Sequence, residues 1–234
     1  MKALRRAGVS LAVLIALFVG ANVIATRVAE DHIGDAVRAE LRLSGRPAVS
    51  VSGFPILFHI LAGDVPKVSI DARDFLIQGL QVLRAHVVLE GIHSDDLLGG
   101  HGITVTVARG SATADTTDRS VDDFLRSRHV DVTIAFVEGS VVVRATKNIF
   151  GRSRMVVATG PVRIDGRKLV FAPTHVTVDG QAAPPSLAAR AREAVAISVA
   201  IPRLPGGITA DGVETHQGYA RFVATLRNER IRLG

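Results

Sequence analysis

The 234-residue chain contains no cysteine and no tryptophan, and aromatic residues make up 4% of it. The absence of cysteine excludes thiol catalysis, iron–sulfur clusters and zinc sites with cysteine ligands. It also excludes lipoprotein anchoring through a thioether. A domain of this size does not need disulfide bonds, because its core is large enough without them.

Motifs that carry catalysis are missing as well. The sequence has no Gly-x-Ser-x-Gly nucleophile elbow, and residues 160–166 have neither the spacing nor the Lys-Ser/Thr of a phosphate loop. No two of the eight histidines stand at the i, i+4 spacing of a helical metal site. The acidic pairs Asp95-Asp96 and Asp122-Asp123 are sequence neighbours, whereas a glycosidase needs two carboxylates that face each other across a cleft. We therefore expect no catalytic residue, metal ion or cofactor, and no enzyme.

Charge is absent from the 20 residues between Ala7 and Thr26. Twenty helical residues span about 30 Å, which is the thickness of a bilayer core. Three basic residues precede the stretch: Lys2, Arg5 and Arg6. Because basic flanks stay in the cytoplasm, we expect the rest of the chain outside it, at the cell membrane or in a periplasm-like envelope space.

Residues 1–26 are either a signal anchor or a signal peptide, since Val23-Ile24-Ala25 is a passable cleavage site. The remainder, residues 27–234, suits a single domain. The formal charge of +6 falls to +3 for this domain, which has 25 basic and 22 acidic residues. Such a mildly basic domain is compatible with an anionic lipid surface and disfavours a nucleic-acid partner.

Apolar periodicity predicts a helix over Arg27–Leu43, where Ala29, Ile33, Val37 and Leu41 recur every four residues. Alternating patterns then predict strands, two of them paired about Glu138-Gly139 and two about Asp165-Gly166. The expected strands are 65–72, 80–89, 103–107, 130–136, 140–146, 155–164, 169–178, 208–214 and 219–226. Two further helices are expected, over 120–128 with Ser120 and Asp123 as a capping box, and over 186–199. The order predicts an α+β fold with a long, curved antiparallel sheet wrapped around one or two helices.

The segment Gly53–Gly63 is apolar on all sides, and His59 is its one polar side chain. Such a segment has to be buried in protein, in lipid or against a ligand. Its position in a domain expected outside the cytoplasm makes the choice among these three central to the function.

Four segments, in this order along the chain, resemble the LmeA-like phospholipid-binding family of actinobacteria. They are Val49-Ser-Val-Ser-Gly-Phe-Pro-Ile-Leu, Asp165-Gly-Arg-Lys-Leu-Val-Phe-Ala-Pro, Ile201-Pro-Arg-Leu-Pro-Gly-Gly-Ile and the final Val213-x-x-x-x-Gly-Tyr-Ala-Arg-Phe-Val. The resemblance covers nearly all of residues 27–234. Two positions depart from the family pattern, because Ile56 replaces a second aromatic residue and Gly206-Gly207 replaces a bulkier sequence.

The resemblance implies a tubular lipid-binding architecture, in which a curved sheet surrounds a helix and an acyl-chain cavity. It implies an extracytoplasmic protein that binds anionic phospholipid of the phosphatidylinositol type. It further implies support of lipomannan or envelope lipid biosynthesis, with envelope glycosyltransferases as partners. The two departures leave the lipid preference open.

The candidate lipid-contacting residues are Phe54, Pro55, Ile56, Leu57, Phe58, Leu61, Ile201 and Leu204. The alternative for this set is that its members fill the core, and for Leu61 and the neighbouring Ile60 that alternative is favoured. Arg152 and Arg154 are candidates for headgroup contact, against the alternative of a solvated basic face. Two other functions stay open: a membrane-tethered scaffold for envelope biosynthetic enzymes, and an enzyme that acts on a lipid-linked glycan.

Overall fold

A computed structural model describes residues 2–93, 103–149, 151–183, 198–201 and 210–233. Within these ranges, the side chains of residues 2–15, 57, 60, 61, 103, 147, 149, 199, 200, 229 and 231–233 lie outside the description. The helices are α1 (Lys2–Leu41), α2 (Ile56–Leu61) and α3 (Asp118–Ser127). The strands are β1 (Ala48–Ser52), β2 (Asp64–Ile77), β3 (Leu80–His93), β4 (Ile103–Thr117), β5 (Thr133–Val137), β6 (Ser140–Ile149), β7 (Arg152–Gly160), β8 (Val162–Asp165), β9 (Lys168–Phe171), β10 (His175–Val178), β11 (Gln181–Ala182), β12 (Ser198–Ala200), β13 (Gly212–His216) and β14 (Tyr219–Leu233).

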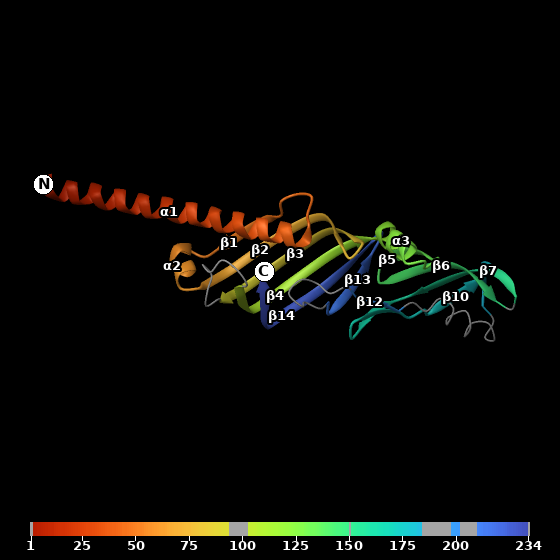
Figure 1. Ribbon diagram of the computed structural model, residues 1–234. Helices are drawn as coiled ribbons and strands as arrows, with labels where there is room; N and C mark the ends of the chain where they lie inside the picture. Colours follow the sequence, from red (N-terminus) through yellow and green to blue (C-terminus); the bar gives the residue numbers. More distant parts are fainter. Residues whose placement is uncertain (1, 94–102, 150, 184–197, 202–209, 234) are drawn as a thin grey trace.

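Helix α1 is continuous from Lys2 to Leu41 and extends well beyond the sheet at its N-terminal end (Figure 1). Its second half confirms the predicted amphipathic helix, which ends two residues earlier than expected. The four residues of the predicted apolar stripe are partly buried and pack against the cores beneath the helix: Ala29, Ile33, Val37 and Leu41. Within the described residues, no helix combines the length and apolarity that crossing a membrane requires. The membrane segment expected at residues 7–26 is therefore not confirmed and stays a prediction.

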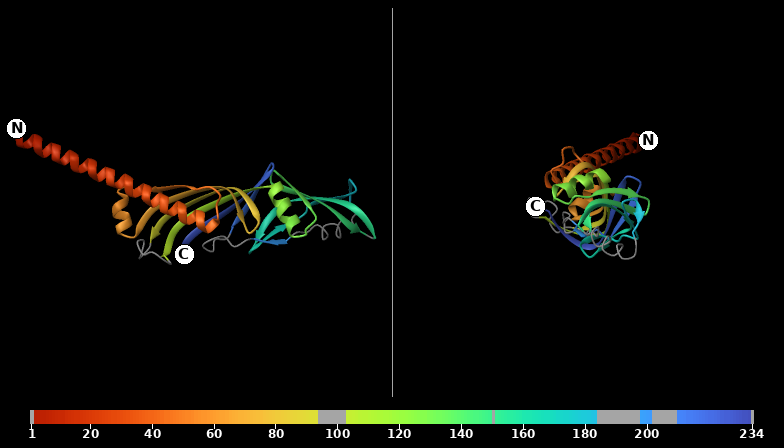
Figure 2. Two further views of the ribbon diagram at one scale, coloured as in Figure 1. Left: turned by 45° about the horizontal axis from the view of Figure 1, so that its top comes forward. Right: turned by 90° about the vertical axis from the view of Figure 1, so that its right-hand side faces the viewer.

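The large sheet has six antiparallel strands in the order β1-β2-β3-β4-β14-β13. It curves beneath the second half of α1, as the end-on view in Figure 2 shows. Glycine at position 91 allows two neighbouring strands to approach closely, since a Cβ there would lie 2.8 Å from the Cβ of Ala108. Side chains along its inner face form two core clusters with α1 and α2, centred on Val107 and on Phe75. The α+β class and the long curved antiparallel sheet are thereby confirmed.

The other half of the domain holds two smaller sheets, β11-β10-β7-β6-β5 and β12-β9-β8. It joins the large sheet through the turn between β13 and β14, where Gly218 donates its N–H to the carbonyl oxygen of Phe136 at 3.1 Å. The amide of Gly139 donates in the same region to the carbonyl oxygen of Thr215 at 3.0 Å. These bonds place the β5–β6 hairpin against the end of the large sheet.

The predicted hairpin about Asp165-Gly166 is present, but each of its arms is broken. The chain leaves β7 at Gly160 and continues as β8, and it leaves β9 at Phe171 and continues as β10. Pro161 and Pro173 stand at the breaks, and proline has no N–H to donate to a ladder. A Cβ on Gly160 would collide with the carbonyl oxygen of Ala172, so the two breaks pack directly on each other. The two long strands expected here therefore divide between two sheets.

The helix expected over 120–128 begins earlier than the capping-box pattern indicates. Thr117 is its N-cap, and the Thr117 hydroxyl accepts the Ser120 amide at 3.2 Å. Thr117 is the last residue of strand β4, so α3 begins directly after the strand, with no loop between them. The helix expected over 186–199 lies outside the described residues.

Candidate functional site

An apolar cavity lies where α3, the two small sheets and the end of the large sheet meet. Its volume is about 60 Å³. Twelve residues line it: Val121, Ile134, Phe136, Val141, Val143, Val162, Leu169, Phe171, Val213, Thr215, Ala220 and Phe222. Threonine 215 is the one polar residue among them, so the cavity suits an apolar ligand.

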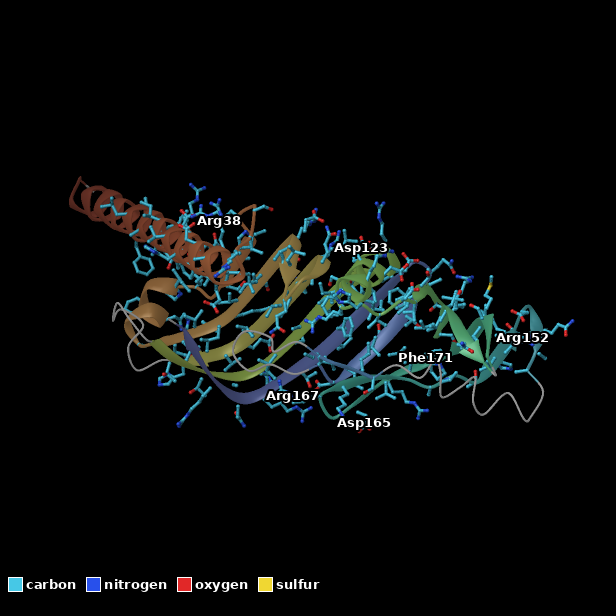
Figure 3. The ribbon with its side chains drawn as sticks, turned by 45° about the vertical axis from the view of Figure 1, so that its right-hand side comes forward. Arg38, Asp123, Arg152, Asp165, Arg167 and Phe171 are labelled. Carbon is cyan, nitrogen blue, oxygen red and sulfur yellow. The ribbon has the colours of Figure 1, made fainter. Side chains whose placement is uncertain are left out.

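Two of the four segments that carry the family resemblance meet in this cavity. The segment beginning at Asp165 supplies Leu169 and Phe171 from strand β9. The final segment supplies residues from β13 and β14: Val213, Thr215, Ala220 and Phe222. The two segments are far apart in the sequence, and the fold brings six of their residues onto one cavity. In Figure 3, Phe171 lies inside the half of the domain formed by the small sheets.

The cavity was not predicted from the sequence, although its signal was present. Alternating apolar residues on β6 place Val141 and Val143 on the same face, and both side chains are almost completely buried. Phe136 on β5 joins them in one core cluster. Alternation alone does not distinguish a strand face that fills a core from one that lines a cavity, because both are apolar.

Helix α3 closes one side of the cavity through Val121. Asp122, the next residue of α3, accepts a hydrogen bond from the amide of Ile134 at 2.6 Å and so fixes α3 to β5. Partial burial raises the pKa of the Asp122 carboxyl, and the hydrogen bond from Ile134 opposes that shift. Asp123, its sequence neighbour, forms a separate ion pair with Arg126 at 2.8 Å. Asp122 thus has a structural role at the cavity, whereas the ion pair of Asp123 lies on the exposed side of α3.

A charged pair lies next to the cavity on the large sheet. Arg221 donates two hydrogen bonds to the Asp115 carboxylate, at 2.7 and 2.9 Å, across strands β14 and β4. Hydrogen bonding to Asp115 is the main reason that the pKa of Arg221 lies above its usual range. The neighbouring His216 stacks on Tyr219 with ring centroids 4.8 Å apart and lies 3.3 Å from Glu138. The Arg221–Asp115 pair and the contacts of His216 stabilise the β13–β14 hairpin, which supplies part of the cavity lining.

The segment Gly53–Gly63 lies at the other end of the molecule, where α2 covers the end of strands β1 and β2 (Figure 1). Ile56 is completely buried and packs in the core with Val51 and Val65. Phe54 and Phe58 point outward, with 66% and 62% of their surfaces exposed. The segment therefore divides into a core side chain and two exposed aromatic rings, rather than lining the cavity as a whole.

The other candidate residues are distributed over both ends. Pro55 is half-buried and follows Phe54 through a cis peptide bond, and Leu57 and Leu61 belong to α2, with side chains outside the description. Ile201 is half-buried and follows β12, which pairs with the cavity strand β9, and its amide donates to the Arg167 carbonyl at 2.9 Å. Leu204 lies outside the described residues. Of the lipid-contacting candidates with a described position, Ile201 is thus the one tied to the strands of the cavity.

The two headgroup candidates stand on strand β7, remote from α2, and Figure 3 shows Arg152 at the tip of the domain. Arg152 is exposed, whereas Arg154 pairs with Asp179 at 2.8 Å. Figure 3 also shows Arg167, which lies on the turn between β8 and the cavity strand β9. The fold therefore places Arg152 and Arg154 far from the segment Gly53–Gly63.

Metal ligands do not gather in the described ranges, where no three histidine, aspartate or glutamate side chains are arranged to hold an ion. His86, on β3, pairs with Asp71 on β2 at 2.9 Å. Asp95-Asp96 lies outside the described residues.

The fold is therefore that of an α+β protein with a long curved antiparallel sheet and an apolar cavity that suits an apolar ligand. The model of the family described as LmeA-like phospholipid-binding matches residues 20–222. The chain belongs to this family, which confirms the resemblance drawn from its four segments. No curated protein and no solved structure matches the chain significantly.

Proposed function

We propose that this protein binds phospholipid in the cell envelope and holds an acyl chain in the cavity between α3, β9 and the β13–β14 hairpin. The observation that carries the proposal is the meeting of two family segments on one apolar wall. Each methylene that leaves water contributes about 0.8 kcal/mol, so a short length of acyl chain suffices for binding without any reacting group.

The headgroup of the bound lipid is an anionic phosphate ester in this proposal, and exposed basic residues near the cavity strands are its partners. Arg167 and Lys168 stand at the β8–β9 turn and are both exposed. Arg152 offers a third exposed basic side chain, on β7. Guanidinium groups bind phosphate with paired hydrogen bonds, which favours arginine for this role.

The proposal extends to a location and a biological role. The uncharged stretch before residue 27 supports an anchor or a signal peptide, with the domain outside the cytoplasm. We further propose that the bound phospholipid serves lipomannan or envelope lipid biosynthesis, where envelope glycosyltransferases are the partner enzymes. Family membership supports binding of phospholipid in general.

A phospholipid with a photoactivatable group at the end of one acyl chain tests the cavity directly. The full-length chain is reconstituted with this lipid, illuminated and digested, and the labelled peptides are identified by mass spectrometry. We expect label on β9 and on the β13–β14 hairpin, in addition to label on α1 from surrounding lipid. Label confined to α1 and α2 would show that the cavity holds no acyl chain and would overturn the proposal.

A further inference from the structure

Exposed apolar side chains gather at the α2 end of the molecule. Along α1, they are Leu17, Phe18, Val19, Val23, Ile24 and Val28. Phe54 and Phe58 add two aromatic rings beside that helix. Figures 1 and 2 show this part of α1 leaving the domain next to α2. Contiguous exposed apolar surface of this kind marks a site of interaction.

Aromatic contacts connect the helix to the α2 end. The Phe18 ring lies 6.2 Å from the Phe54 ring, at an interplanar angle of 84°, and 6.2 Å from the Phe58 ring. These distances are typical of favourable aromatic pairs. We call Phe18, Phe54 and Phe58 the aromatic tip. Although its rings touch, two of them remain largely exposed, so their contact with each other does not complete their burial.

The position of Phe18 within the uncharged stretch sets the depth of the tip in a membrane. Phe18 precedes Thr26 by eight residues, or about 12 Å along a helix. If the bilayer ended before Phe18, the uncharged residues left for the span would be Ala7–Leu17, about 17 Å of helix. A bilayer core is about 30 Å thick, so these residues are too few. Any span by this helix therefore draws Phe18 below the membrane surface, together with the two rings that contact it.

Polar contacts hold α1 in its place on the domain, so the tip follows the helix. Arg46, in the connection after α1, binds Asp31 at 2.9 Å and Asp35 at 2.8 Å. Glu30 accepts the amide of Val51 from the edge strand β1 at 3.0 Å. The helix residues in these bonds lie one to three turns beyond the uncharged stretch 7–26, and the bonds fix the direction in which α1 leaves the sheet.

We propose that the aromatic tip inserts into the outer leaflet of the bilayer beside α1, and that the membrane lipid is the partner of this exposed apolar surface. Ile56 anchors α2 in the domain core, while Phe54 and Phe58 on either side of it face the lipid. The domain then stands on the membrane by its α2 end, and α3, which lines the apolar cavity, lies well away from that end (Figure 1). The inference rests on the membrane segment of the proposed function and is independent of what the cavity holds.

Depth-dependent quenching in vesicles tests the insertion, and the absence of cysteine in the chain makes single labels straightforward. The full-length variants Phe54→Cys and Phe58→Cys carry a fluorescent thiol label in phosphatidylcholine–phosphatidylglycerol vesicles. Two exposed apolar residues away from the tip provide matched controls, Leu76→Cys on β2 and Met155→Cys on β7, at 64% and 57% exposure. Quenchers are a nitroxide at the upper part of the acyl chain and aqueous iodide.

At the tip positions we expect quenching by the lipid nitroxide and at least a fivefold lower iodide quenching constant than at the control positions. Iodide quenching equal to that of the controls would show that the tip stands in water and would overturn the proposal. Protection from iodide without quenching by the lipid nitroxide would place a protein partner on the tip, and it would overturn the proposal too. Acyl-chain crosslinking in the cavity is read separately, so failure of insertion is distinguishable from failure of lipid binding.

Discussion

Filling the cavity with protein atoms should abolish the proposed binding of an acyl chain without harming the fold. Val213→Phe is the suitable change, because Val213 lines the cavity from β13 and is only partly buried. The larger ring occupies the space in which the acyl chain is proposed to lie. A ring that displaces three methylenes weakens lipid binding by about 2.4 kcal/mol, or about fiftyfold.

The same substitution has the opposite effect on the lipid-free protein. Empty volume costs about 24 cal/mol per Å³ in protein cores. The cavity volume is about 60 Å³, so filling it contributes at most about 1.4 kcal/mol. For a chain of this size, that gain raises the melting temperature by about 3–6 °C. Loss of ligand together with a gain in stability is a combination that general damage to the core does not produce.

The assay is acyl-chain photocrosslinking of the full-length chain, with a thermal melt of the delipidated protein. Val49→Phe is the matched control, since Val49 is also partly buried but packs in the core at the α2 end. We expect Val213→Phe to lose the label on β9 and β14, while label on α1 is retained in both variants. Wild-type labelling of β9 in Val213→Phe would refute the assignment of the cavity as the lipid site.

Three further predictions concern the elements that surround the cavity. Thr117→Ala removes the N-cap of α3 and should cost about 1 kcal/mol, seen as faster hydrogen exchange of the first α3 amides while β5–β6 exchange is unchanged. Arg221→Met leaves the Asp115 carboxylate, whose side chain is 13% exposed, without its partner. The free energy of unfolding in urea should fall by about 2–3 kcal/mol. The double variant with Asp115→Asn should recover part of that loss, and no recovery would contradict the pairing. Asp122 has a raised pKa, so the folded state binds its proton more tightly than the unfolded state, and its contribution to stability is full below pH 3.8 and is lost as pH rises through the folded pKa. Asp122→Asn should remove that pH dependence and keep the hydrogen bond to Ile134 through its amide oxygen, and an unfolding free energy with an unchanged pH profile just above 3.8 would disprove the shift.

Local patterns predicted most of the elements, because their causes are local. The recurrence of Ala29, Ile33, Val37 and Leu41 predicted the buried face of α1, and the alternation in 103–107 predicted β4, although the strand runs on to Thr117. The split hairpin at Pro161 and Pro173 was missed. A proline signals that a ladder stops, but it does not say that the chain passes to a different sheet.

The segment Gly53–Gly63 also shows that a local pattern does not determine what each side chain contacts. Its apolar composition predicted burial in protein, lipid or ligand, and the structure divides it residue by residue. Ile56 enters the core, while Phe54 and Phe58 remain exposed beside Phe18. Phe18 lies more than 30 positions earlier in the chain, so no local periodicity relates it to the other two rings.

The sequence by itself determined the class of the protein: an α+β domain after an uncharged stretch, without thiol chemistry, and with four segments of a phospholipid-binding family. Only the tertiary structure decided where those segments act. It brings Phe171 from β9 and Phe222 from β14 to one apolar cavity, and it places Phe54 and Phe58 at the opposite end. The physical reason is that strand alternation fixes which face of a strand is apolar, whereas long-range pairing between strands fixes what that face meets.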